Sequence, residues 1–320
     1  MKTYDLLIIG GGPAGVAAGV YASRKKLQTL LVTEDFGGQS VVSEGIENWI
    51  GTIKISGADL AKSLENHLRA YAGDVVEIKT GKRVIEIKKH ADYTEANPLF
   101  VSKISNISLS ESEEIISKSV LIATGSAHRK LPAIGADTFE HKGLTYCATC
   151  DGPMFGDQDV AVVGGGNAAL EAVAQLSAYC KSVTLINRSK AFRADPITVE
   201  KVLARPNVSV ITPAEVLEVK GEQFVNGLKY KNTETNEENY LDLTGIFVEI
   251  GMLPATGFAK EIVELNEYNK IVVDPMTQRT KTTGIWASGD CTNGLYHQNN
   301  IAVGDAVKAL EDIYISLSKR

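Results

Sequence analysis

The sequence predicts an α/β protein with two doubly wound, Rossmann-like dinucleotide-binding domains, each carrying an antiparallel β-meander. Two observations lead to this prediction. A run of apolar, mostly β-branched residues ends in three glycines and opens into an Ala-rich helical pattern, and this happens twice, at residues 4–15 and 158–169. A second apolar run follows each helix, which completes a βαβ unit. Such a unit implies a parallel sheet with a right-handed crossover.

Composition limits the class of protein and its partners. The chain has 320 residues, of which 44% are hydrophobic and 22% charged, so it is long enough for about two domains. A net charge of -6 argues against a nucleic-acid partner. No apolar stretch reaches the length of a membrane span or resembles a signal peptide. Four cysteines are too few for a disulfide scaffold, so we expect a reducing, cytoplasmic location.

The first glycine-rich turn has the spacing of a dinucleotide fingerprint. Gly10, Gly12 and Gly15 form G-x-G-x-x-G between a strand and a helix. In this motif the first glycine makes the tight turn, the second lets a pyrophosphate approach the backbone, and the third permits close packing of the helix. Glu34, at the end of the next strand, is expected to accept a hydrogen bond from a ribose hydroxyl.

The second glycine-rich turn is a variant of the same fingerprint. Gly164, Gly166 and Ala169 stand in the same frame, but no acid follows the next strand. Arg188 and Arg193 lie there instead, and arginines at this place suit a 2′-phosphate, which favours NADPH. A surface loop with two solvated arginines is the alternative. Two dinucleotide sites in one chain indicate a flavin together with a nicotinamide.

The remaining sequence predicts two meanders and a C-terminal helix. Residues 75–125 and 208–251 alternate short strand-like runs with polar turns, and residues 232–239 are expected to form the tip of a hairpin. Near the C-terminus, Asp290 ends a short apolar run and precedes an amphipathic helical pattern at 297–317. An acid at the carboxyl end of a parallel strand lies where such sheets bind ligands, although a helix cap is an equally good interpretation.

Two cysteines separated by two residues raise three alternatives. Cys147 and Cys150 would need a second pair of ligands to bind zinc, and neither Cys180 nor Cys291 supplies one, so we expect no metal site. A structural disulfide over so short a loop would remove little entropy from the unfolded chain. A redox-active dithiol fits better, with Asp151 as the group that exchanges protons with the thiolates. For Asp151 a capping role is the alternative, and Cys180 and Cys291 are expected in the core.

Several segments in one order resemble the low-molecular-weight, bacterial-type thioredoxin reductases and the related flavoprotein component of alkyl hydroperoxide reductase. The resemblance covers essentially the whole chain. The segments are GGGPAG at 10–15, GGQ at 37–39, IENWIG at 46–51, IATG at 122–125, YCATCDG at 146–152, VGGGNAALEA at 163–172, FRAD at 192–195 and SGDC at 288–291.

This resemblance implies an FAD- and NADPH-dependent thioredoxin-disulfide reductase that works as a homodimer. It also implies that Cys150 is the sulfur next to the flavin and that Asp151 is the acid for the departing thiolate. Besides the residues already named, it implies cofactor contacts from Pro13, Ala14, Gly38, Gln39, Asn48, Thr124, Gly125, Asp290 and Gln298 to FAD, and from Asn167 and Ala168 to the nicotinamide nucleotide.

The position of the dithiol separates this branch from the glutathione reductases, whose redox cysteines follow the first fingerprint. Here the pair precedes the second nucleotide unit. We therefore expect residues 1–125 and 251–320 to form the FAD domain and residues 126–250 to form the nicotinamide domain with the dithiol. By resemblance, one domain rotates against the other about hinges near Ser126 and Gly251, so that the nicotinamide and the dithiol take turns at one flavin.

The chain departs from the family pattern at several positions. Asn187 and Ser189 flank the first arginine where the family commonly has His-Arg-Arg, which leaves NADH use open. His297 and Asn299 replace the usual Arg and Ala, and Ile50 replaces a Pro. Because no domain precedes the flavin strand, a separate thioredoxin-like acceptor is expected. The alternatives are a reductase fed by NADH, ferredoxin or another flavin donor, and a regulator that binds nucleotide or metal without catalysis.

Overall fold

The computed structural model describes residues 2–43, 45–106 and 112–319, without the side chains of Val42 and Cys150. Its residues separate into two compact units. The first comprises Met1–Val42, Trp49–Ala127 and Leu253–Arg320, and the second comprises Ser43–Asn48 and His128–Met252. Each unit contains a five-stranded parallel sheet and, as a separate sheet, an antiparallel meander. The predicted fold class is confirmed.

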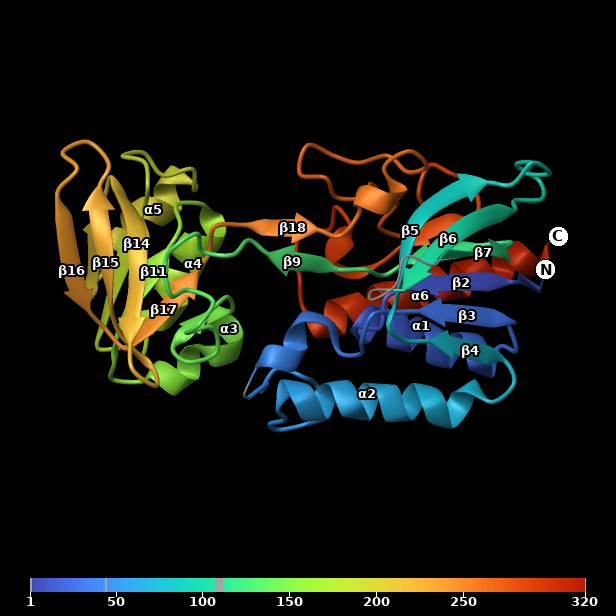
Figure 1. The fold of residues 1–320 in the computed structure, drawn as a ribbon, viewed down its shortest axis with the longest axis horizontal. Helices are drawn as coiled ribbons and strands as arrows, with labels where there is room; N and C mark the ends of the chain where they lie inside the picture. The colour runs from blue at the N-terminus through green and yellow to red at the C-terminus, as the bar shows by residue number, and fades with distance from the viewer. Residues whose placement is uncertain (1, 44, 107–111, 320) are drawn as a thin grey trace. The chain divides into compact units, whose positions relative to one another are not determined.

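The first unit is built on a parallel sheet with the strand order β19-β8-β2-β3-β4, of which Figure 1 labels β2, β3 and β4. Three helices and a second sheet, with the order β1-β7-β6-β5, complete it. The strands of the parallel sheet are β2 (Leu6–Ile9), β3 (Thr29–Val32), β4 (Val76–Lys79), β8 (Val120–Ile122) and β19 (Ile285–Ala287). The second sheet contains β1 (Thr3–Tyr4), β5 (Lys82–Lys89), β6 (Phe100–Asn106) and β7 (Ser112–Ser117). The helices are α1 (Pro13–Arg24), α2 (Gly57–Ala72) and α6 (Asn299–Ser318), with 3-10 turns η1 (Gly38–Val42), η3 (Gly257–Ala259) and η4 (Gly289–Cys291).

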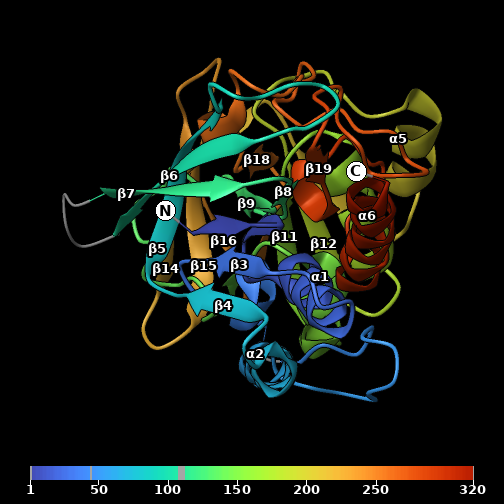
Figure 2. The same cartoon turned by 90° about the vertical axis from the view of Figure 1, so that its right-hand side faces the viewer.

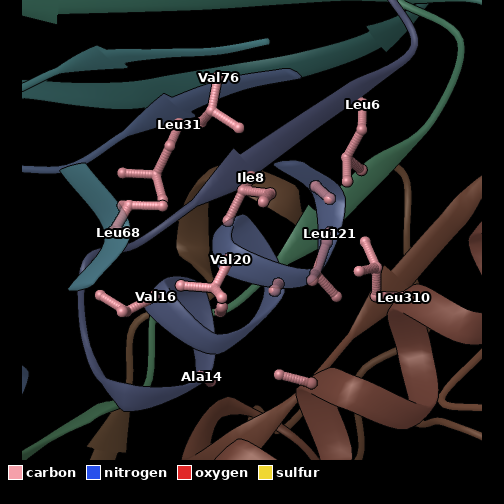
Figure 3. Packing of buried hydrophobic residues seen from close by; sticks show 14 of the residues in the cluster. Leu6, Ile8, Ala14, Val16, Val20, Leu31, Leu68, Val76, Leu121 and Leu310 are labelled. Atoms are coloured by element: carbon pink, nitrogen blue, oxygen red, sulfur yellow. The ribbon is translucent and has the colours of Figure 1, made fainter. Parts of the chain in front are cut away.

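Successive side chains of β2 point to opposite faces of the sheet, and both faces are covered. Leu6 and Ile8 pack with α1, α2 and α6, which lie on one side of the sheet, as Figures 2 and 3 show. Leu7 and Ile9 pack with residues of the β5–β7 meander on the other side. All four side chains are at most 3% exposed. A strand buried on both faces is uniformly apolar, and this is how the sequence LLII at 6–9 specifies it.

The second unit repeats this plan. Its parallel sheet has the order β10-β17-β11-β12-β13, and its antiparallel sheet has the order β14-β15-β16. The parallel strands are β10 (Leu144–Thr145), β11 (Asp159–Val163), β12 (Ser182–Ile186), β13 (Val208–Ile211) and β17 (Gly245–Val248). The antiparallel strands are β14 (Ala214–Gly221), β15 (Val225–Asn232) and β16 (Glu238–Asp242). The helices are α3 (Ala148–Asp151), α4 (Asn167–Leu176) and α5 (Pro196–Leu203), with one 3-10 turn, η2 (Gly152–Phe155).

Burial in the second unit follows the same alternation. Val160 and Val162 of β11 pack with α4 and α5, whereas Ala161 and Val163 pack with the β14–β16 sheet. The turn between β15 and β16 forms the predicted hairpin tip, with Asn236 at a positive φ of 61°. In the other meander, residues 107–111 lie outside the described residues.

The chain passes between the units in two short strands, β9 (Ser126–His128) and β18 (Met252–Pro254), which pair with each other. The backbone amide of Arg129 donates to the Gly251 carbonyl (2.9 Å), and that of Ala255 donates to the Gly125 carbonyl (3.1 Å). The predicted hinges lie in or next to these strands, and the rotation itself stays a prediction. Across the described residues, no helix has both the length and the apolar character needed to cross a membrane.

Candidate functional site

The turn after β2 requires glycine at two positions. Gly10 has a φ of 118°, and a Cβ there would lie 2.3 Å from the carbonyl oxygen of Ala123 on the neighbouring strand connection. A Cβ at Gly15 would lie 1.9 Å from the carbonyl oxygen of Gly10. Both contacts are shorter than any real Cβ contact. These glycines therefore let α1 pack directly against the turn.

Gly12 differs from its two neighbours in the motif, because the protein leaves space beside it. A Cβ at Gly12 would meet no atom closer than the Cα of Gly38, at 3.8 Å. Gly12 is also the N-cap of α1, and no side chain caps the helix there. The helix N-terminus thus presents uncapped amides to an open space, which is the arrangement that binds a pyrophosphate. The residues present fit a dinucleotide at this turn.

Other predicted FAD contacts lie in the same unit. The Oε1 atom of Gln39 is buried and has no hydrogen-bond partner among the described residues, so it can accept a bond from a ligand. Ser40 Oγ donates to Asn299 Oδ1 (2.9 Å), which connects η1 with the start of α6. Gln298 is the N-cap of α6. Thr124 Oγ1 donates to the Ala255 carbonyl (2.8 Å).

The carboxylates of two predicted contact residues, Glu34 and Asp290, have basic partners within the protein. Glu34 forms two bonds with Arg83, from Nε to Oε1 (2.5 Å) and from Nη2 to Oε2 (3.0 Å). Its proposed ribose contact stays a prediction. Asp290 Oδ1 lies 3.5 Å from His297 Nδ1, and the other ring nitrogen of His297 lies 2.6 Å from Lys270 Nζ. Burial lowers the pKa of Lys270, whereas the nearby Asp290 opposes this shift.

The turn after β11 repeats the geometry of the first. A Cβ at Gly164 would lie 2.3 Å from the carbonyl oxygen of Glu249, whereas a Cβ at Gly166 would meet no atom within 4 Å. Gly166 is the N-cap of α4, again without a side-chain cap, so this turn also fits a dinucleotide. The next residues of the helix are Asn167 and Ala168, and Asn167 Oδ1 accepts a bond from the amide of Asp195 (2.9 Å).

The loop with the two arginines is held by Asn187. This side chain is 7% exposed, and its Nδ2 donates to the carbonyls of Ser189 (2.6 Å) and Ala191 (3.2 Å). Asn187 therefore shapes the loop through bonds to its backbone. Arg188 and Arg193 are exposed, and neither guanidinium has an acidic partner in the part of the chain that the structure describes.

Asp151 is held by two hydroxyl groups. Ser43 Oγ donates to Asp151 Oδ1 (3.2 Å), and Thr145 Oγ1 donates to Asp151 Oδ2. Thr145 Oγ1 also accepts a bond from the amide of Cys147 (3.3 Å), so the hydroxyl connects the acid with the first cysteine. This arrangement fixes a carboxylate one residue beyond the C-x-x-C sequence, where it can exchange a proton with a thiolate.

The four cysteines fall into two groups. Cys147 is disulfide-bonded, and the side chain of Cys150 lies outside the described residues. Cys180 and Cys291 are buried free thiols, as predicted. Burial raises the pKa of each of these two thiols to about 11, so they remain protonated and unreactive at neutral pH. Among the described residues, no group of three or more His, Cys, Asp or Glu is arranged to hold a metal ion.

The structure thus places predicted residues at the two glycine turns, residues 10–15 and 164–168, and at the short helix α3, and the other predicted residues lie on further loops and turns. It also adds residues that the sequence did not single out: Ser43 and Thr145 beside Asp151, and Glu249, whose carbonyl oxygen lies beneath the second turn. Of these contacts, only the polar character of Thr145 was visible as a local signal. The contacts themselves depend on the tertiary fold.

Comparisons with known proteins place these features in context. The family model described as pyridine nucleotide-disulphide oxidoreductase matches residues 4–306. The chain is 37% identical over 308 residues to a protein named NADH dehydrogenase from Bacillus subtilis (strain 168), covering 96% of this chain and 57% of that protein. It is 38% identical over 309 residues to a component of alkyl hydroperoxide reductase from Pseudomonas putida, with 96% and 57% covered. The chain therefore spans little more than half the length of these curated relatives.

A solved structure matches over nearly the whole of both chains. The crystal structure of thioredoxin reductase from Streptococcus pyogenes superimposes with a TM-score of 0.87 at 33% sequence identity, and the match covers 99% of each chain.

Proposed function

Because the chain belongs to the pyridine nucleotide-disulphide oxidoreductase family, we propose that it is a thioredoxin-disulfide reductase. In this proposal electrons pass from NADPH through FAD and the Cys147–Cys150 pair to a separate thioredoxin-like protein. The protein would work as a homodimer in a reducing, cytoplasmic compartment, with the two units rotating about β9 and β18. The family implies flavin and nicotinamide nucleotide binding, and the particular nucleotides are part of the proposal.

One observation supports this proposal more strongly than any other. Cys147 is disulfide-bonded immediately before α3, and α3 ends at an acid that two hydroxyl groups hold in place. A structural disulfide needs no such acid, whereas a disulfide that opens and closes needs a group to protonate the departing thiolate. Ser43 and Thr145 orient Asp151 for this task, and Cys150 is the sulfur we propose to face the flavin. FAD, when bound, would supply the centre that accepts a hydride and returns an electron pair.

The cofactor residues are assigned by the same reasoning. We propose that FAD lies over the first turn with contacts from Gly10, Gly12, Pro13, Ala14, Gly15, Glu34, Gly38, Gln39, Asn48, Thr124, Gly125, Asp290 and Gln298. For the nicotinamide nucleotide we propose Gly164, Gly166, Asn167, Ala168, Arg188 and Arg193. Open space beside Gly12 and Gly166 and the unpartnered Oε1 of Gln39 support this assignment.

The proposed function is tested by steady-state turnover of the purified flavoprotein. We expect NADPH oxidation to depend on an added oxidised thioredoxin and to release two free thiols for each nucleotide consumed, because one hydride reduces one disulfide to a dithiol. A flavin that is reduced by NADPH but transfers no electrons to thioredoxins would contradict the proposal that a thioredoxin-like protein is the electron acceptor. A flavin that neither NADPH nor NADH reduces would favour a ferredoxin- or flavin-fed enzyme, which the open second turn argues against.

A second candidate is the same enzyme fed by NADH and acting on a different disulfide protein. The names of the two curated relatives support it, since one is called NADH dehydrogenase and the other belongs to an alkyl hydroperoxide reductase. Asn187 adds to this support, because it is used within the loop and does not provide a cation for a 2′-phosphate. The preference between the two nucleotides then rests on Arg188 and Arg193.

Arg188→Ala is expected to weaken NADP⁺ binding by about tenfold and to leave NAD⁺ binding unchanged. A charge-assisted hydrogen bond to a phosphate contributes about 1.5–3 kcal/mol, and each 1.4 kcal/mol is tenfold in affinity. Isothermal titration of both oxidised nucleotides measures the effect, and Arg193→Ala is tested in parallel. Lys190→Ala is the matched control, because Lys190 lies in the same loop but is paired with Glu234 (2.8 Å). Equal losses for both nucleotides would contradict a 2′-phosphate clamp.

A further inference from the structure

The polar hairpin tip between β15 and β16, residues 233–237, lies at one particular edge of the second unit. The backbone amide of Ala214, at the start of β14, donates to the carbonyl of Asn187, which directly follows β12 (2.9 Å). Ala214 is also the register partner of Asn232, the last residue of β15 before the tip. The tip therefore stands at the carboxyl end of β12. In parallel sheets this is the edge at which dinucleotides bind.

The arginine loop, residues 188–193, is held between this tip and the second fingerprint turn. At one end of the loop, the amide of Arg193 donates to the carbonyl of Gly165 inside the turn (2.7 Å). At the other end, Thr233 Oγ1 of the tip donates to the carbonyl of Arg188 (3.5 Å). Bonds to its backbone thus connect the loop with both neighbours, so the loop lies next to the proposed nucleotide site and next to the tip.

The arginine loop carries three cationic side chains, and an acid of the tip pairs with one of them. Lys190 Nζ lies 2.8 Å from Glu234 Oε1. Arg188 and Arg193 have no acidic partner within the described ranges. The side chains of Lys190 and Glu234 are 69% and 55% exposed, so this pair is open to a ligand and contributes little to folding stability. We therefore expect the pair to affect binding and not the fold.

We propose that Glu234 is a specificity-determining residue of the second nucleotide site. By pairing with Lys190 it withholds one of the three cations from a 2′-phosphate, and its own charge repels this group. A phosphate of this kind carries about −1.5 to −2 charges at pH 7, whereas NAD⁺ has an uncharged hydroxyl at the same position. Glu234 therefore lowers the affinity for NADP⁺ and leaves that for NAD⁺ unchanged. This inference rests on the proposed nucleotide site, and it names the residue that weakens the preference of this site for NADPH.

The test measures binding of NADP⁺, and separately of NAD⁺, to the flavin-loaded protein by isothermal titration. Both nucleotides are oxidised and transfer no hydride to the oxidised enzyme. In Glu234→Gln we expect the NADP⁺ dissociation constant to fall about tenfold, because the released Lys190 forms a charge-assisted contact with the phosphate. The NAD⁺ dissociation constant should stay within about twofold of the wild-type value, since only a screened charge is lost.

Lys190→Ala identifies the cation that Glu234 withholds. Alone, this change should leave the NADP⁺ dissociation constant within about twofold of the wild-type value, because Glu234 already holds the lysine. In the Lys190→Ala background, Glu234→Gln should lower this constant by no more than about twofold, since only a screened repulsion of longer range is then removed. The larger gain in affinity thus requires the lysine.

Glu222→Gln is the matched control for the loss of one negative charge. Glu222 is exposed in the turn before β15, at the opposite end of that strand from the tip. Its replacement should leave the binding of both nucleotides unchanged. Thermal unfolding of Glu234→Gln should match that of the wild type, because an exposed ion pair contributes little to stability. A change in NADP⁺ binding is then assigned to the site and not to the fold.

The outcomes separate this inference from the function on which it rests. Equal NADP⁺ affinity of the wild type and Glu234→Gln would overturn the role of Glu234 and leave the nucleotide site standing. The same gain with and without Lys190 would also overturn it, since Lys190 would then not be the withheld cation. A gain for both nucleotides would place the effect away from the 2′-phosphate and contradict it as well. No binding of either nucleotide by any of these proteins would overturn the proposed nucleotide site and this inference with it.

Discussion

A variant with serine at both Cys147 and Cys150 is expected to bind FAD and to be reduced by a pyridine nucleotide, yet to lose reduction of protein disulfides by at least about 1000-fold. The physical reason is that hydride transfer to the flavin needs no thiol, whereas electron transfer to a protein acceptor proceeds through thiol–disulfide exchange. Stopped-flow absorbance would follow flavin reduction, and thiol release would follow the second half of the reaction.

Cys180→Ala is the matched control for this variant. Cys180 is a free thiol buried in the core of the second unit, and its pKa, raised to about 11, makes it unreactive. Its replacement should lower the free energy of unfolding by roughly 1 kcal/mol and leave turnover unchanged. Full disulfide reductase activity in the double-serine variant would refute the proposed dithiol. Loss of flavin binding in it would show that the pair has a structural role instead.

The fold was predictable from the sequence because its signals are local. The glycine turns at 10–15 and 164–169 follow strands of uniform apolar character, and the sheets they specify are buried on both faces. The repetition of the whole pattern made the assignment stronger than either motif alone. The two cysteines and the acid that follows them are also contiguous, so their association required no tertiary information.

The remaining parts of the site could not be predicted, because they join residues that are distant in sequence. The hydrogen-bonded residues Ser43 and Asp151 are 108 positions apart in the sequence, and Glu34 and Arg83 are 49 positions apart. The domain boundaries predicted from the sequence placed residues 43–48 in the first unit, whereas the contacts of these residues group them with the second unit. Glu249 shows the limit most clearly. In the sequence it is an ordinary acid, and only the folded structure shows that burial and the nearby Glu171 raise its pKa, whereas the amide of Ala148 opposes this shift.

Gly12→Ala and Gly166→Ala form a matched pair that separates the two nucleotide sites without disturbing the fold. Gly12 has a φ of -72° and Gly166 a φ of -101°, both of which alanine adopts freely. A Cβ at either position would meet no protein atom within 3.8 Å. An added methyl group should therefore leave each apo unit intact and intrude only on a bound pyrophosphate.

We expect Gly12→Ala to weaken FAD binding, and Gly166→Ala to weaken nicotinamide nucleotide binding while the flavin content stays normal. Overpacking costs about 1–3 kcal/mol, which is roughly 5- to 150-fold in the dissociation constant. Flavin content and NADP⁺ titration measure the two effects, and thermal unfolding of the flavin-free proteins confirms that both folds survive. Gly15→Ala is the contrasting variant: its Cβ would lie 1.9 Å from the Gly10 carbonyl, so it should destabilise the first unit itself. If Gly12→Ala bound FAD as tightly as the wild type, the pyrophosphate would have to lie elsewhere, because a ligand that passes close to this backbone cannot avoid the added methyl group.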